Sequence, residues 1–457
     1  MIVWLGSLSL GLSYLISPVI VSWCRRKSAR LTAIAGGLMA SLGCLFASFG
    51  SQFHQVFLSY GIFLSIGIGI ARESANLMVG QYFKRKRYFV EIFIQSSLGI
   101  GIAVMSPFLS WSIGMFKHWR AGLQLITCTL FATFLIAVLY RPASLYHPQR
   151  RAILHLKTQR RKIREKNPIN NKPPFFDLTP LKAKSLQLII VSTFLFSFGY
   201  LSPLFYWVHI IDQNSRGTIE EMQSVISPGV IFRYIYFGIS LTIGVIIFGY
   251  LTVNRRFKNR INKQYLCQIS MLLTVLVLIS NVYFNESAIL DFVSIFIYGV
   301  AIGAFNYSHK MLVYSLIRAK NFGKAWSYVQ FTQSFAIFLG IPLSGHINIW
   351  FHESAPYYGF VFSAVMCLSG TVLLLALNPE FKNISQNLSD KLHDLHHHSC
   401  NASSDIQHLN PMTPPNAVCD TIDDKTCKPQ KRTIETVTEE TSRSFVLHPM
   451  GLNMGSL

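Results

Sequence analysis

Arg72 and Glu73 stand side by side within a long apolar stretch, residues 55–83. At 1.5 Å per helical residue they lie roughly 18 Å from the basic run that begins at Lys84. If the stretch crosses a membrane, a charge at that depth costs about 3 kcal/mol or more and is a candidate for function. Arg72 could hold a carboxylate while Glu73 exchanges a proton; alternatively, the two form a structural pair whose charges cancel. Adjacent residues point about 100° apart on a helix, so we expect them to meet different partners. Asn76 lies one turn from Arg72 on the same face.

Arg233 is a second cation within an apolar stretch, residues 225–253. If its helix starts after Pro228-Gly229, the side chain lies about one turn inside the outer surface and can reach water. An earlier helix start would instead turn Arg233 towards an internal cavity. The sequence alone leaves both interpretations open.

A third group of polar residues lies near the end of the apolar stretch 289–314, beside a basic loop. Lys310 there could line a vestibule that opens towards the basic side, or it could anchor the helix end. We therefore select the following candidate substrate-binding residues: Arg72, Glu73, Asn76, Arg233, Asn306, Tyr307 and Lys310.

These candidates must be positioned by about eleven apolar stretches, most of them roughly 20 residues long and so long enough to cross a bilayer. The stretches are 1–23, 31–50, 55–83, 89–115, 119–140, 187–211, 225–253, 264–284, 289–314, 324–350 and 356–377. This pattern predicts an all-α polytopic membrane protein.

The loops between the stretches alternate in charge. The basic loops contain Arg25, Arg26, Lys27, Arg30, Lys84 to Arg87, Arg255, Arg256, Lys258, Arg260, Lys263, Arg318, Lys320 and Lys324. Opposite loops carry little beyond Lys117, Arg120 and Arg216. Because Lys- and Arg-rich loops stay in the cytosol, we expect the N-terminus outside and the C-terminus inside.

Composition supports the membrane class and argues against several others. Charged residues make up 13% of the chain, against roughly 25% in soluble domains. The net charge of +21 is concentrated beside the apolar stretches, where it indicates topology and attraction to anionic lipid headgroups, not nucleic-acid binding. The eight cysteines show no CxxC spacing, which argues against a zinc site or a disulfide framework. No nucleophile–base constellation or phosphate loop occurs, so we expect neither an enzyme nor a cofactor.

Changes in composition divide the chain into four parts. An N-terminal bundle of five spans covers 1–140, a basic linker covers 141–186, and a C-terminal bundle of six spans covers 187–378. The tail, 379–457, is polar and is expected to be disordered and cytosolic. Within the linker, residues 148–166 could form a basic amphipathic helix on the membrane surface, or they could be solvated.

Several segments resemble one family, the monocarboxylate-transporter-like branch of the major facilitator superfamily. Trp4–Ser13 is similar to the second helix of the family and Ala33–Gly43 to the third. Val79–Arg87 resembles the end of the fourth helix, and His118–Arg120 resembles the start of the sixth. The eleventh helix is similar to Phe322–Trp326 and Gly340–Gly345. The resemblance is strong over about 1–140 and weaker over 187–377.

The resemblance implies a carrier of the plasma membrane in which two helical bundles rock around a central site. It implies small carboxylates as substrates, often in symport with protons, and for several relatives a single-span immunoglobulin-like chaperone as partner. The similarity begins at the second helix of the family, so we expect the first helix to be absent from this chain.

This chain departs from the family at its charged pair. The family carries an aspartate and, four residues later, an arginine in the helix that corresponds to 225–253. When Gly249 is aligned with the glycine that follows the pair, Leu241 and Val245 occupy those positions. If the first helix is absent, the substrate-facing lysine that the family carries there is expected to be absent too. Proton coupling through these groups is therefore not expected.

Together these observations predict a secondary carrier of a small organic solute, a carboxylate, that works by alternating access. The alternative is a transport-inactive, truncated family member that acts through partner or lipid binding. Counter-transport in proteoliposomes would distinguish the two.

Overall fold

The computed structural model describes residues 2–26, 28–83, 86–116, 118–141, 155, 158–159, 175–205, 228–254, 262–283, 288–317, 321–351 and 357–377. These residues belong to one unit of the chain, Met1–Leu388. The tail predicted over 379–457 lies outside the described residues. The linker helix predicted over 148–166 also lies outside them, apart from three isolated residues.

The N-terminal part of the chain is a series of helices. They are α1 (Ile2–Leu15), α2 (Ser17–Arg26), α3 (Ala29–Phe49), α4 (Phe53–Val56), the π-helix η1 (Phe57–Leu64), α5 (Ser65–Tyr82), α6 (Arg87–Phe116) and α7 (Trp119–Val138). The last turn of α2 carries Arg25 and Arg26, which interact favourably with the negative end of the helix dipole.

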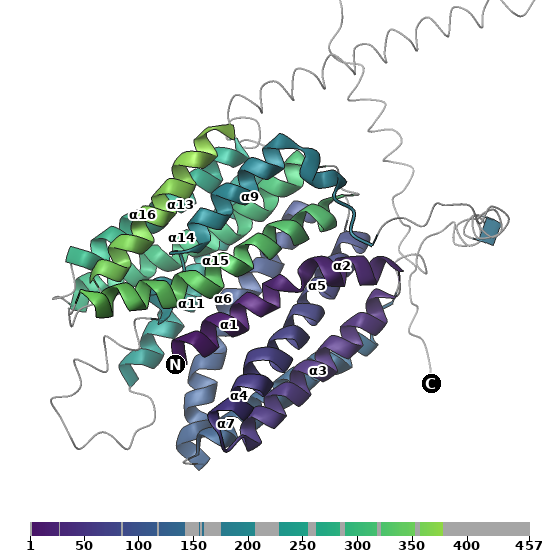
Figure 1. Ribbon diagram of the computed structural model, residues 1–457, viewed down its shortest axis with the longest axis horizontal. Coiled ribbons are helices and arrows are strands. Elements are labelled where there is room, and N and C mark those ends of the chain that lie inside the picture. The colour runs from purple at the N-terminus through teal and green to yellow at the C-terminus, as the bar shows by residue number, and fades with distance from the viewer. Residues whose placement is uncertain are drawn as a thin grey trace, which may run out of the picture. The chain divides into compact units, whose positions relative to one another are not determined.

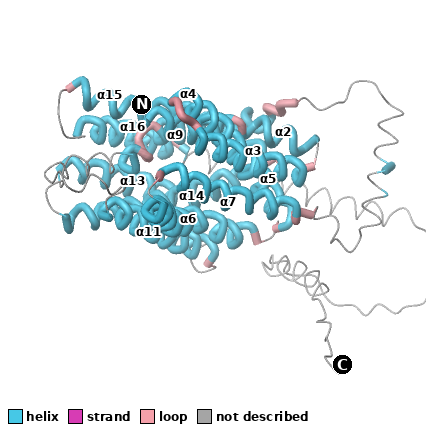
Figure 2. The backbone as a smooth tube through the Cα atoms, turned by 90° about the horizontal axis from the view of Figure 1, so that it is seen from below, coloured by secondary structure: helices cyan, strands magenta, loops and turns pink. Residues whose placement is uncertain are grey.

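The C-terminal part is also helical. It contains the 3₁₀-helix η3 (Thr179–Lys182), α9 (Lys184–Ser197), α11 (Pro228–Val253), α13 (Lys263–Tyr283), α14 (Ala288–Leu316), α15 (Phe322–Trp350) and α16 (Tyr357–Leu375). Figure 2 shows helices joined by loops, with no strand in the described part of the chain. The all-α fold class is therefore confirmed.

Ten helices among the described residues are long and apolar enough to cross a membrane. They match ten of the predicted stretches, and α1 and α2 together make the first. The remaining stretch, 324–350, corresponds to α15, which has 29 residues and is long enough to cross. Its hydropathy is lower than that of the others, because polar residues such as Gln330, Gln333 and His346 are spread along it.

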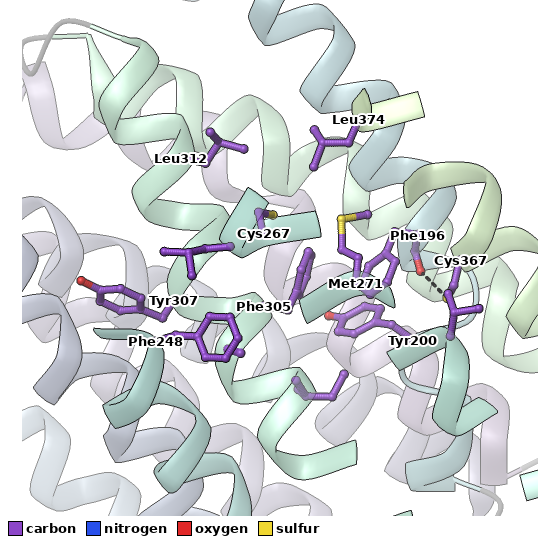
Figure 3. Close-up of a cluster of buried hydrophobic side chains, with 14 of the residues drawn as sticks. Phe196, Tyr200, Phe248, Cys267, Met271, Phe305, Tyr307, Leu312, Cys367 and Leu374 are labelled. Carbon is purple, nitrogen blue, oxygen red and sulfur yellow. Dashed lines mark hydrogen bonds between the residues drawn. The ribbon is translucent and has the colours of Figure 1, made fainter. Parts of the chain in front are cut away.

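Two bundles with different interiors pack against each other. A large apolar core lies among α9, α11, α13, α14, α15 and α16, and Figure 3 shows part of it around Phe196, Tyr200 and Phe305. In the N-terminal bundle α3 packs on α5 and α7, with a small core at Ala40, Cys44 and Leu64. The bundles meet where α1 packs along α15 (Figure 1) and where α6 packs along α11.

Glycines bring α6 and α11 into backbone contact. A Cβ atom built on Gly99 would lie 2.5 Å from the carbonyl oxygen of Gly238, and one built on Gly238 would lie 2.5 Å from the Gly99 oxygen. Any larger residue at either position would force the helices apart. This agrees with the expectation that small residues let neighbouring membrane helices approach closely.

Candidate functional site

Lys310 and Glu91 form a buried ion pair between the two bundles. Lys310 belongs to α14 and Glu91 to α6, and their side chains are 3% and 1% exposed. The Lys310 ammonium donates to the Glu91 carboxylate, and also to Asn76 Oδ1 of α5 at 3.2 Å. Gln95, one turn further along α6, donates to the same Glu91 oxygen at 2.8 Å. These neighbours offset part of the cost of burying two charges.

Sequence reasoning selected Lys310 and Asn76 but missed Glu91. Glu91 lies four residues, or about one turn, after Arg87, the first residue of α6. A carboxylate so close to a helix end resembles one that lies at the membrane surface. The rule that an ionisable residue inside a span marks a candidate site would have found it. Its partner could not have been found in this way, because the two residues are 219 positions apart.

Arg72 is held at the junction of α5 and α1. Its Nε lies 3.3 Å from Glu73 Oε1, its terminal nitrogen donates to the Ser13 carbonyl oxygen at 3.0 Å, and its guanidinium lies 4.0 Å from the centre of the Tyr14 ring. The expectation that Arg72 and Glu73 meet different partners is thus met only in part, because they also contact each other. The Glu73 side chain is 2% exposed and that of Arg72 is 29% exposed.

Arg233 lies in the second turn of α11 and pairs with Asp291 in the first turn of α14. Two nitrogens of the guanidinium donate to one carboxylate oxygen, and both side chains are partly exposed. This pair ties two helices of the same bundle, whereas Lys310 and Glu91 join different bundles.

Tyr307 adds a second contact between α14 and α6. Its hydroxyl donates to the backbone oxygen of Tyr88 at 3.0 Å. The Tyr88 hydroxyl in turn accepts a hydrogen bond of 2.8 Å from Lys263 at the start of α13. Asn306, the neighbouring candidate, is partly buried. The contacts of Tyr307 are therefore those of a residue that holds the bundles together.

An aromatic group from the C-terminal bundle lies beside Lys310. His309 stacks on Phe305, with ring centres 5.1 Å apart, and approaches Trp326 of α15 at 5.4 Å. The His309 ring nitrogen Nε2 shares a hydrogen bond of 2.9 Å with the Thr193 hydroxyl of α9. The Lys310 ammonium lies 5.8 Å from the centre of the Trp326 ring, close enough for a cation–π interaction.

Leu241 and Val245, which replace the charged pair of the family, lie in the apolar core of the C-terminal bundle. They are 1% and 0% exposed. A charge at either position would be buried among hydrocarbon side chains, at high cost. In this chain the buried cation beside the interface is supplied by α14 instead of α11.

Comparison with known proteins agrees with the fold. The sequence pattern of the Major Facilitator Superfamily matches residues 1–317. Monocarboxylate transporter 14 of Homo sapiens is 28% identical over 141 residues, which cover 31% of this chain and 28% of that protein. Monocarboxylate transporter 12 of Homo sapiens is 24% identical over 279 residues, covering 58% and 51%. Monocarboxylate transporter 10 of Rattus norvegicus is 20% identical over 375 residues, covering 80% and 69%.

The chain thus spans about a quarter to a half of the length of the first relatives it matches. The relatives are transporters, so the prediction that the chain is not an enzyme is confirmed by the likeness. Because the superfamily pattern matches well over half of the residues, the chain belongs to the Major Facilitator Superfamily, and within it resembles the monocarboxylate transporters.

Proposed function

We propose that this protein is a secondary carrier that moves a small organic anion, a carboxylate, across the plasma membrane by alternating access. The observation that carries the proposal is the buried Lys310–Glu91 pair. Carriers of this kind bind their solute where two bundles meet, and a pair that joins the bundles responds directly to their rocking.

Lys310 suits the role of anion-binding residue. An ammonium group has three donors, of which Glu91 and Asn76 take two. A solute carboxylate takes the third donor or displaces Glu91, whose carboxylate is then free to accept a proton. Arg72, which is partly exposed, offers a second cation on the opposite bundle.

Uptake of labelled short carboxylates into proteoliposomes tests this role. Lys310→Met removes the charge but keeps a flexible side chain, and we expect uptake to fall at least about 30-fold. Lys310→Met/Glu91→Gln removes both charges of the pair and leaves neither without a counter-charge, so it should fold normally and still fail to transport. Lys184→Met, which removes an exposed lysine at the start of α9, is the matched control and should retain uptake.

Uptake that survives in the neutral double variant would show that the cation is not needed. Absence of counter-transport by the wild-type protein for every carboxylate would favour the alternative, a member that acts through partners or lipids. Symport with protons and a single-span chaperone partner, which the resemblance implies, belong to the same proposal. So does a cytosolic position for the basic loops, which their charge supports.

A further inference from the structure

One face of α15 carries polar side chains close to both the apolar core and the contact with α1. Ser334 lies on the side of the helix that meets α1, since a Cβ built on Gly11 would lie 3.2 Å from the Ser334 carbonyl oxygen. Ala325 and Val329 lie on the side that faces the C-terminal core. At about 100° per residue, the stripe formed by Trp326, Gln330 and Gln333 falls between Val329 and Ser334, on the part of the helix surface where Phe322 and Ile337 also enter the apolar core. This stripe begins beside Lys310, which lies 5.8 Å from the Trp326 ring.

Two polar atoms on this stripe are buried without a hydrogen-bond partner among the described residues. They are the indole nitrogen Nε1 of Trp326, a donor, and the amide oxygen Oε1 of Gln330, an acceptor. The Gln330 side chain is 3% exposed. Buried polar groups in proteins almost always have a partner, because leaving one unpaired is costly.

These two atoms share one helix with each other, whereas the other unpartnered polar atoms of the described residues lie on α2, α6, α9 and α13. Trp326 and Gln330 are one helical turn apart, roughly 6 Å along the axis. They therefore offer a donor and an acceptor to the same small molecule, next to a buried ammonium group.

We propose that Trp326 and Gln330 complete the solute site around Lys310, and that the solute carries a hydroxyl or amino group in addition to its carboxylate. The inference rests on the proposed function. Lys310 and the Trp326 N–H bind the carboxylate oxygens, and Gln330 Oε1 accepts a hydrogen bond from the hydroxyl or amino group. Gln330 is then the residue that determines specificity, because a solute without a donor leaves its buried oxygen unpaired.

Four carboxylates of equal chain length test the proposal in proteoliposomes: propanoate, 2-oxopropanoate, 2-hydroxypropanoate and 2-aminopropanoate. We expect uptake at limiting concentration to favour a donor-bearing probe over 2-oxopropanoate by on the order of tenfold or more, since a site built to bond a donor rejects analogues that lack it. The hydroxyl and amino probes show which donor is used.

Variants of the stripe assign the preference to a residue. Gln330→Leu should bring the ratio of donor-bearing to donor-free uptake close to one, and Gln330→Glu, which keeps an acceptor, should preserve a preference. Gln333→Leu is the matched control, since Gln333 lies on the same face and is also buried, and it should leave the ratio unchanged. Trp326→Phe should lower the uptake of all four probes by a similar factor.

If the ratio of donor-bearing to donor-free uptake in Gln330→Leu equals that of the wild type, the inference is overturned. Equal uptake of all four probes by the wild-type protein would also overturn it. Size-exclusion profiles and thermal unfolding of each variant show that it is folded. Lys310-dependent uptake without preference would contradict this inference alone. Uptake that survives Lys310→Met, or no uptake of any probe, would contradict the proposed function and this inference with it.

Discussion

At the scale of residues, the Lys310–Glu91 pair makes stability depend on keeping both charges or neither. Each side chain is nearly fully buried. Removing one partner leaves an uncompensated charge inside the protein, whereas replacing both by apolar groups removes the cost altogether. The Arg233–Asp291 pair is partly exposed, so water can compensate its loss.

We expect Glu91→Gln to lower the free energy of unfolding by about 3–5 kcal/mol, because Lys310 then stays buried without a counter-charge. Lys310→Met/Glu91→Leu should recover most of this loss. Asp291→Asn is the control and should cost no more than about 1 kcal/mol. Unfolding in detergent, followed by circular dichroism, measures all three. A Glu91→Gln protein as stable as the wild type would mean that water reaches the pair.

At the scale of elements, the end of the linker, residues Phe175–Lys182, contacts both bundles. The guanidinium of Arg26, at the end of α2, lies 4.8 Å from the Phe175 ring. The Asp177 carboxylate pairs with Lys324 of α15. The Tyr328 hydroxyl, one turn along α15, donates to the backbone oxygen of Asp177 at 3.2 Å. This segment therefore ties α2 to α15 at the helix ends that carry the basic loops.

Asp177→Asn should loosen this connection. The amide cannot attract the Lys324 ammonium as the carboxylate does, so we expect the end of α2 to become more accessible. Cys24 reports this, since it lies in the last turns of α2 and is partly buried. In a chain whose other cysteines are replaced by serine, maleimide should label Cys24 faster in Asp177→Asn. Asp291→Asn should leave the rate unchanged, and equal rates in all three proteins would contradict the expectation.

The effect of Asp177→Asn on the labelling rate of Cys24 should not depend on pH near neutrality. Hydrogen bonds from the Thr179 hydroxyl and backbone N–H lower the pKa of Asp177 below 3.8, and Arg25 lowers it further. A carboxyl group whose pKa is lower in the folded state contributes stability that is fully present above the unfolded pKa and lost as pH falls through the folded one. The ratio of the two labelling rates should therefore be constant from about pH 6 to about pH 8. A ratio that drifts over this range would implicate another group.

At the scale of the whole molecule, the charge of the loops predicts which side of the membrane each helix end faces. Ser28, between α2 and α3, lies in a basic loop, and Ser51, between α3 and α4, lies at the other end of α3; both are exposed. In the chain without native cysteines, we expect a membrane-impermeant maleimide to label Ser51→Cys on intact cells. Ser28→Cys should react only after permeabilisation. The reverse pattern would invert the predicted topology.

The sequence by itself determined the class of fold and most of the spans. Long apolar stretches and basic loops are properties of the local sequence, and their physical meaning does not depend on which helices later pack together. The family resemblance was also present in short segments. The match over residues 1–317 confirms the superfamily, and the similar monocarboxylate transporters confirm the likeness to that branch.

Only the tertiary structure decided which buried charges meet. Nothing near Lys310 in the sequence indicates Glu91, because their contact depends on how α14 of one bundle packs against α6 of the other. Sequence spacing also predicted separate partners for Arg72 and Glu73, but the long arginine side chain turns back to its neighbour as well as to α1. The direction of a helix face follows from local periodicity, whereas the partner opposite that face is set by packing between helices that are distant in the chain.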